Sequence, residues 1–94
     1  MTKLTDLEET AARFAERPFA ELYTEVGLPA GPTRIVARIG GRGWPPRLLL
    51  ALDRKRRNAG DGPLPGSPET QALLRELGVP LMDRHLAESP LRTG

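Results

Sequence analysis

Four consecutive cations, Arg54-Lys55-Arg56-Arg57, are the densest group of side chains able to do chemistry in this sequence of 94 residues. Arginine pairs with phosphate or carboxylate through parallel N–H donors, and clustered cations attract polyanions more strongly than scattered ones. The cluster belongs to segment 27–60, which has eight arginine and lysine side chains, one acid and a net charge of +7. Segments 1–26 and 61–94 carry −3 and −2, so the total of +2 conceals a polarised molecule. We therefore expect a polyanionic partner.

The expected site lies on a helix over residues 47–58. At 100° per residue, Leu48, Leu49 and Leu52 fall on one face of this helix and the opposite face is basic. An exposed cation in a last turn gains only about 0.3–1 kcal/mol from the helix dipole, and four adjacent cations exceed that need. We expect the arginines to clamp phosphates, with Asn58 or Arg42 contacting a base. The predicted nucleic-acid-binding residues are Arg42, Arg47, Arg54, Lys55, Arg56, Arg57 and Asn58.

Two segments carry a glycine between two runs of apolar residues. In Thr33–Asp53, Ala37 and Gly41 stand where a small helical residue and a turn glycine would stand. In Thr70–Glu88, Leu73, Leu77, Gly78 and Val79 follow the same general pattern of apolar residues around a turn glycine. Both segments resemble, in part, the helix-turn-helix motif of DNA-binding proteins. The resemblance implies a DNA-binding regulator or accessory protein whose partner is double-stranded DNA, and it is compatible with a homodimer on paired half-sites.

The alternative function is a protein-interaction module. Leu50 lies near Arg57 on the basic side of the helix, and Trp44 stands alone in a glycine-rich loop between arginines. As partner-binding anchors, Trp44 and Leu50 would let a phage- or plasmid-type regulator or adaptor dock its basic helix on an acidic surface of a larger protein. A lone tryptophan more often completes a small core. The sequence favours the core for Trp44 and leaves the anchor role open.

Three acids, Asp6, Glu9 and Glu16, line the outer face of the first predicted helix. Acids in this pattern are typical of a solvated face. They could instead dock on the basic helix and mask it, which would be an autoinhibitory arrangement. The sequence leaves both interpretations open.

Enzymatic chemistry has few candidate residues. His85 is the only histidine, and with Asp83 and Glu88 nearby it offers a sparse acid–base or metal site. Neither lysine follows a glycine-rich run, so there is no P-loop. The absence of cysteine removes thiol nucleophiles, disulfides and Cys-based zinc sites. We therefore expect no enzyme activity, no catalytic residue, no metal and no cofactor.

The sequence predicts a cytoplasmic protein without membrane contact. Its first residues lack the apolar core of a signal peptide, and small secreted scaffolds usually need the disulfides that this chain cannot form. The longest unbroken apolar run, 48–52, is far shorter than the roughly 20 residues that a bilayer requires.

Length and composition predict one small all-α domain. The apolar fraction of 38% is mostly leucine and alanine with four aromatic residues, which favours helix packing over a sheet. We expect a bundle of four or five short helices with a Gly/Pro-rich loop before the last two. The segments are acidic helices in 5–26, a basic segment 27–60, a loop 59–66, a C-terminal helical hairpin 67–88 and a frayed tail 89–94.

The helix limits follow from capping signals. Thr5-Asp6-Leu7-Glu8 reads as a capping box for a helix over about 6–16, and a second helix follows Pro18 and stops at Gly27. Pro46 opens the basic helix, and Ser67-Pro68 opens the one that Gly78 ends. A last short helix is expected at 81–88. For 34–39 we expect a short helix, and a strand is the alternative.

Overall fold

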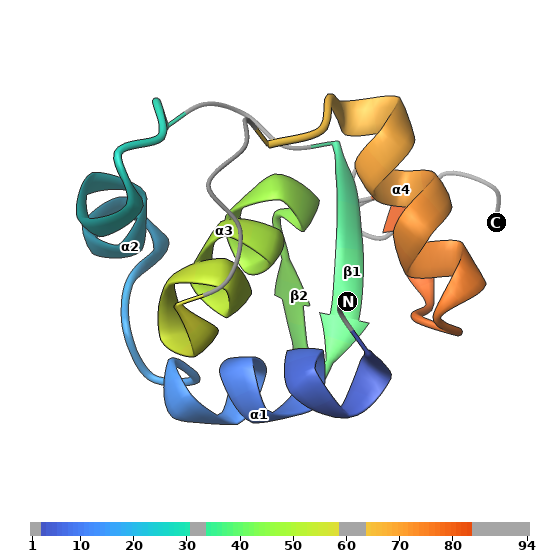
Figure 1. The fold of residues 1–94 in the computed structure, drawn as a ribbon, viewed down its shortest axis with the longest axis horizontal. Helices are drawn as coiled ribbons and strands as arrows, with labels where there is room; N and C mark the ends of the chain where they lie inside the picture. Colours follow the sequence, from blue (N-terminus) through green and yellow to red (C-terminus); the bar gives the residue numbers. More distant parts are fainter. Residues whose placement is uncertain (1–2, 31–33, 59–63, 84–94) are drawn as a thin grey trace, which may run out of the picture.

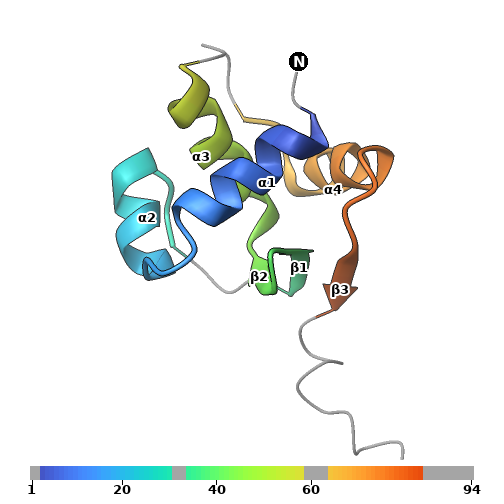
Figure 2. The ribbon, with the colours of Figure 1, turned by 90° about the horizontal axis from the view of Figure 1, so that it is seen from below.

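The computed structural model describes residues 3–30, 34–58 and 64–83. The helices and strands in these ranges are α1 (Leu4–Arg13), α2 (Phe19–Val26), β1 (Ile35–Ile39), β2 (Arg42–Trp44), α3 (Pro46–Arg57), α4 (Ser67–Glu76) and β3 (Leu81–Asp83). The strands form an antiparallel sheet in the order β2-β1-β3 (Figure 1). Helices α1, α3 and α4 lie on one side of the sheet, and no described helix covers the other side (Figure 2). The fold is therefore mixed α/β.

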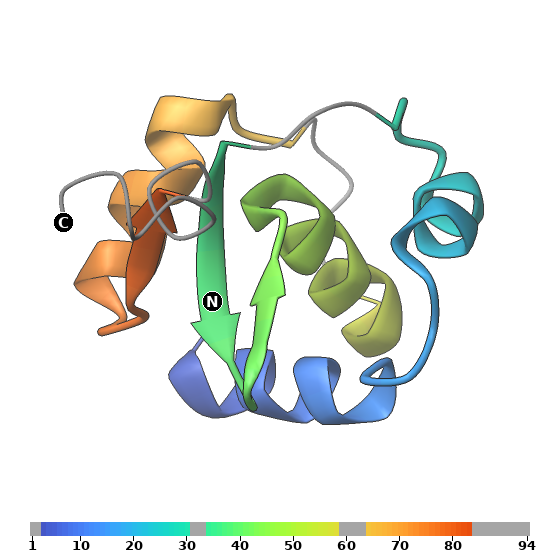
Figure 3. The same cartoon turned by 180° about the vertical axis from the view of Figure 1, so that it is seen from behind.

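The predicted all-α fold is wrong because residues 35–39 form a strand. This segment is rich in β-branched side chains, which suit a pleated surface. Gly40 and Gly41 have φ of 63° and 80°, so they form the two-residue turn of a hairpin instead of ending a helix. The hairpin pairs Ile39 with Arg42 and Ala37 with Trp44, and it lies in front of α3 in Figure 3.

The predicted C-terminal helical hairpin, 67–88, is contradicted at residues 81–83, which form a strand. Helix α4 forms, and Gly78 follows it with φ of 86°. The chain then enters β3, which pairs with β1 and places Met82 opposite Val36. Residues 84–88 and the predicted tail 89–94 lie outside the described residues, as do 59–63 of the predicted loop. Residues 64–66 of that loop belong to no helix or strand.

The other helices follow the sequence closely. Helix α2 ends at Gly27 as predicted, with φ of 74° at that glycine. Helix α1 runs from residue 4 to residue 13 and is capped by Asp6, whose carboxylate accepts the backbone N–H of Lys3 at 3.0 Å. The expected capping box was two residues too late, and the expected end was three residues too late. Helix α3 begins with Pro46 in its first turn, as predicted.

Helix α3 is the central element of the fold. It packs against α1, α2 and α4, and residues 46 and 48–53 of its twelve are buried. Leu48, Leu49 and Leu52 are fully buried, as predicted. Because neighbouring helices pack around it, the middle of α3, residues 48–53, is buried and is not available to a groove of DNA. The basic residues of α3 stand at its two ends, with Arg47 near the start and Arg54, Lys55, Arg56 and Arg57 in the last turn.

Candidate functional site

The end of α3 holds a network of charged side chains around Asp53, which is fully buried. Arg57 donates to this carboxylate through Nε at 3.1 Å and through a terminal nitrogen at 2.9 Å. Thr10 of α1 places its hydroxyl 3.2 Å from Asp53 Oδ1, in the donor position. Arg56 approaches the same oxygen at 3.7 Å. A buried carboxylate needs such partners, because an unpaired charge away from water costs several kcal/mol.

The network continues from α3 onto α1. Arg56 donates through Nε to the Thr10 hydroxyl at 2.9 Å and through a terminal nitrogen to the Asp6 carbonyl at 3.2 Å. It also pairs with the Glu9 carboxylate at 3.2 Å. Arg57 lies 3.7 Å from the Asp6 carboxylate. The acidic first helix and the basic third helix are thus joined by complementary charges within one molecule.

Two arginines of the predicted phosphate clamp, Arg56 and Arg57, therefore bind other residues of the protein itself. The side chains of Arg56 and Arg57 are only 15% and 22% exposed. Hydrogen bonding to Asp53 raises the pKa of Arg57 above its ordinary value, and an arginine is charged at physiological pH even without this shift. The interpretation in which α1 acids dock on the basic helix is confirmed for Asp6 and Glu9. Glu16 is exposed and makes no ion pair with another described residue.

The Arg42 side chain also makes its contacts within the protein. Its guanidinium donates to the carbonyls of Phe14, Ala15 and Arg17 at 2.8–3.0 Å, which satisfies the chain where α1 ends. The same group lies 4.0 Å from the ring centre of Phe19 and 4.7 Å from that of Trp44. Burial lowers the pKa of Arg42, yet a guanidinium remains charged at neutral pH. Base contact by Arg42 would require breaking this arrangement.

The remaining residues of the predicted cluster are closer to solvent. Lys55 is exposed and donates to the Glu25 carbonyl at 3.1 Å, with the Glu25 carboxylate at 3.7 Å, so it ties α3 to α2. Asn58 is exposed and ends α3 in a left-handed conformation, with φ of 53°. Arg54 is partly exposed and has an interaction partner. The predicted partner anchors are buried: Trp44 is completely inaccessible and Leu50 is 2% exposed.

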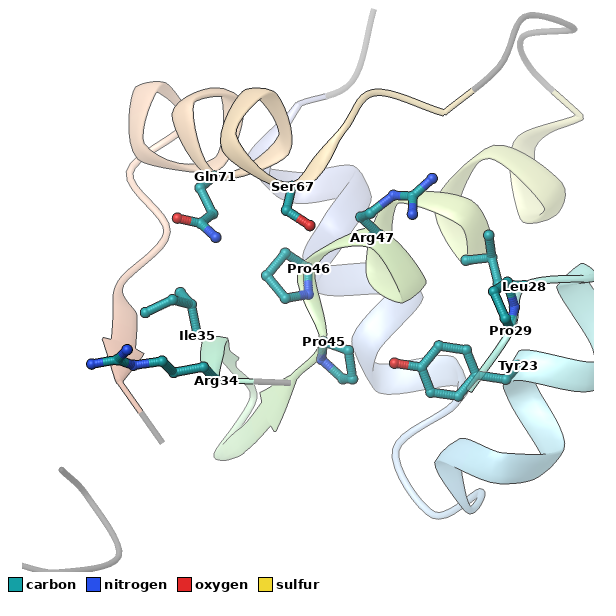
Figure 4. Close-up of a pocket in the computed structure, with 10 residues that line it drawn as sticks. All are labelled: Tyr23, Leu28, Pro29, Arg34, Ile35, Pro45, Pro46, Arg47, Ser67 and Gln71. Atoms are coloured by element: carbon teal, nitrogen blue, oxygen red, sulfur yellow. The ribbon is translucent and has the colours of Figure 1, made fainter. Parts of the chain in front are cut away.

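A cavity of about 340 Å³ lies at the opposite end of α3 (Figure 4). Its walls come from the end of α2 and the turn after it, the start of β1, and the first residues of both α3 and α4. Much of the lining is apolar, and Tyr23 points its ring toward Pro45 (Figure 4). The lining residues are Tyr23, Leu28, Pro29, Arg34, Ile35, Pro45, Pro46, Arg47, Ser67 and Gln71.

The cavity has a positive electrostatic character. Among the described residues that line it, two are arginines and none is an acid. Arg47 donates through Nε to the Pro65 carbonyl at 3.1 Å and makes no ion pair within the described ranges. Arg34 is 76% exposed and pairs with Asp83 at 2.8 Å. Helices α3 and α4 both begin here, and helix N-termini carry partial positive charge.

The sequence predicts one of the two cavity arginines as a binding residue. Arg47 was among the predicted site residues, whereas Arg34 was counted only in the basic segment. The sequence gives little indication that the other lining residues belong to the site. Ser67 and Gln71, for example, belong to α4, which a loop separates from the basic segment. Asp53 could have been recognised as a structural carboxylate, because it precedes Arg56 and Arg57 by three and four residues on one helix.

Other candidate sites gain no support. Asp83 pairs with Arg34, and its expected neighbours His85 and Glu88 lie outside the described residues. No group of three potential metal ligands occurs within 3–30, 34–58 and 64–83. In the same part of the chain, every helix is too short or too polar to cross a bilayer. Comparison with protein-family models, curated proteins and solved structures finds no match. Both segments that resemble a helix-turn-helix contain a strand where that motif has a helix, at 35–39 and at 81–83, and the DNA-binding role that the resemblance implies stays a prediction.

Proposed function

We propose that this protein is a nucleic-acid-binding accessory protein that contacts phosphates at the cavity, through Arg34 and Arg47. The observation that carries the proposal is that the described residues lining one concave site include two arginines and no carboxylate. Arginine binds phosphate through bidentate, charge-assisted hydrogen bonds. An apolar cavity with a few convergent polar groups is also the usual form of a ligand site.

Three other cations of the basic segment are poorer candidates for phosphate contacts. Arg42, Arg56 and Arg57 already satisfy carbonyls or carboxylates of the protein itself. Arg34 is held less firmly, because its pair with Asp83 is exposed and such pairs contribute at most about 1 kcal/mol. A phosphate would compete for the Arg34 guanidinium with the Asp83 carboxylate, which is 17% exposed.

A binding titration tests the proposal. We expect the Arg34→Gln, Arg47→Gln double variant to bind a labelled oligonucleotide at least tenfold more weakly at about 50 mM salt. The magnitude of the negative slope of log K against log salt should decrease by about 1 to 2, because two phosphate contacts are lost. Fluorescence anisotropy at several salt concentrations measures both quantities.

The matched control removes the same charge elsewhere. Arg13 and Arg75 are exposed and form no ion pair with another described residue. The Arg13→Gln, Arg75→Gln double variant should keep the wild-type affinity within about threefold, as distant charges are screened beyond about 10 Å. Equal losses in both double variants would contradict a localised site, and the absence of wild-type binding at about 50 mM salt would contradict the function.

A second candidate function is docking on an acidic protein surface, which the open face of the sheet favours. Met82 is 36% exposed there, beside Val36 in the strand register. Arg38 is exposed on the same face and makes no ion pair within the described ranges. If this candidate is correct, a protein that co-purifies with the chain should be lost on Met82→Asp and retained by the Arg34→Gln, Arg47→Gln variant. The opposite pattern would contradict it.

A further inference from the structure

The cavity that we assign to phosphate binding also has an apolar interior. Tyr23, Ile35 and Pro45 are among the residues that line it, and the two arginines lie toward opposite sides in Figure 4. Ser67 and Gln71 extend from α4 toward the same space and can form hydrogen bonds. A phosphate alone could contact the arginines but would leave the apolar part of the lining without a contact. The occupant must therefore combine an anionic group with a flat or apolar one that has polar edges.

We infer that the cavity receives one unpaired base of a single-stranded nucleic acid, while Arg34 and Arg47 contact the adjacent phosphates. This inference rests on the proposed function and names its ligand more closely. The volume of about 340 Å³ is near the lower end of the range of about 300–1,000 Å³ for ligand sites, so it suits one nucleotide unit.

The chemistry of the lining matches the parts of a nucleotide. An aromatic ring such as that of Tyr23 can stack on any base, which is the usual source of affinity in sequence-tolerant single-strand binding. The Gln71 amide and the Ser67 hydroxyl can each donate to or accept from a base edge. A duplex keeps its bases paired and stacked, so a base could enter the cavity only after flipping out of the helix.

The charge arrangement argues in the same direction. Among the described residues two arginines flank the cavity, and Arg56 and Arg57 at the far end of α3 are engaged with Asp53, Asp6 and Glu9. Two phosphate contacts correspond to a salt slope of about −1.4 for a single strand. Affinity beyond this small electrostatic part must come from the base. Binding should therefore depend on the presence of a base and on its being unpaired.

The test compares ligands on the unmodified protein. Labelled oligothymidylate of about ten nucleotides, a duplex of the same length and an abasic strand with the same number of phosphates are titrated at about 50 mM salt. We expect the thymidylate to bind at least tenfold more tightly than the other two. Oligouridylate is the RNA arm, in which the same dependence on the base is expected.

The outcomes separate the two claims. If the duplex and the abasic strand bind as tightly as the thymidylate, the base-in-cavity inference is overturned while the proposed function stands. If none of the nucleic acids binds, both are overturned. A thymidylate affinity that is unchanged in the Arg34→Gln, Arg47→Gln variant would place the site elsewhere and would overturn the inference.

A pair of variants at Tyr23 tests the stacking contact. Tyr23→Leu removes the aromatic ring, and Tyr23→Phe keeps it as the matched control. We expect the leucine variant to lose at least about fivefold in affinity for thymidylate and less than twofold for the abasic strand, with the phenylalanine variant near wild type. A global loss of structure would weaken both ligands alike, and thermal unfolding followed by circular dichroism detects it. A folded Tyr23→Leu protein with unchanged thymidylate affinity would overturn the stacking contact.

Discussion

Replacement of Asp53 by asparagine is expected to lower the free energy of unfolding by about 3 kcal/mol. The asparagine keeps the shape of the side chain but loses the negative charge that faces Arg57 and Arg56. Removing one partner of a buried ion pair leaves the other charge uncompensated, at a cost of about 3–5 kcal/mol. We place the effect at the lower end because both arginines are partly exposed.

Urea unfolding at neutral pH measures this effect. With a denaturant dependence of about 1–3 kcal/mol per molar, the midpoint should fall by roughly 1 to 3 M. The control is Glu9→Gln, which removes another carboxylate bound to Arg56 but one that is 71% exposed. That variant should lose less than about 1 kcal/mol. If the two variants are equally stable, Asp53 is not the carboxylate that holds α1 on α3.

Replacement of Arg42 by alanine is expected to lower the free energy of unfolding by about 4 kcal/mol. The guanidinium serves three carbonyls after α1, and hydrogen bonds to charged groups contribute about 1.5–3 kcal/mol each without being additive. Its contact with the rings of Phe19 and Trp44 contributes about 0.5–2 kcal/mol more. Arg42→Lys should recover part of the loss, since an ammonium lacks the planar fork.

Binding separates a structural arginine from a ligand contact. At a temperature where it remains folded, Arg42→Ala should bind oligonucleotide as tightly as the wild type. Arg75→Ala is the stability control, because an exposed helix position without an ion pair to a described residue should change stability by no more than about 0.5 kcal/mol. Equal stability of the two variants, or a large affinity loss in folded Arg42→Ala, would contradict the assignment.

The helices could be predicted from the sequence because their signals are local. Proline in the first turn of α3, the glycine after α2 and the leucine spacing at 48, 49 and 52 each depend on a few neighbouring residues. The sheet could not be derived in the same way, because β3 pairs with β1 across about 45 residues of chain. The hairpin was nevertheless visible. Gly40-Gly41 after a β-branched run is a two-residue turn signal, and we read it as the end of a helix.

The uneven distribution of charge could be read from the sequence, but the ion pairs that these charges form within the protein could not. The excess of cations in segment 27–60 and of acids in segment 1–26 predicted an external polyanion. In the structure, much of this opposition is internal, because Arg56, Arg57 and Lys55 pair with acids of α1, α2 and α3. Sequence alone cannot separate an internal partner from an external one, because the choice depends on which helices pack together.

The most direct test of the account is an amide chemical-shift map of the protein titrated with oligothymidylate. Arg47 and the Arg54–Arg57 cluster lie at opposite ends of α3, about 10–15 Å apart at 1.5 Å per residue, so the map distinguishes them. We predict that the largest shifts occur around the cavity, at Leu28, Ile35, Arg47, Ser67 and Gln71. Shifts concentrated on Arg54 to Asn58, with the cavity residues unchanged, would contradict the account.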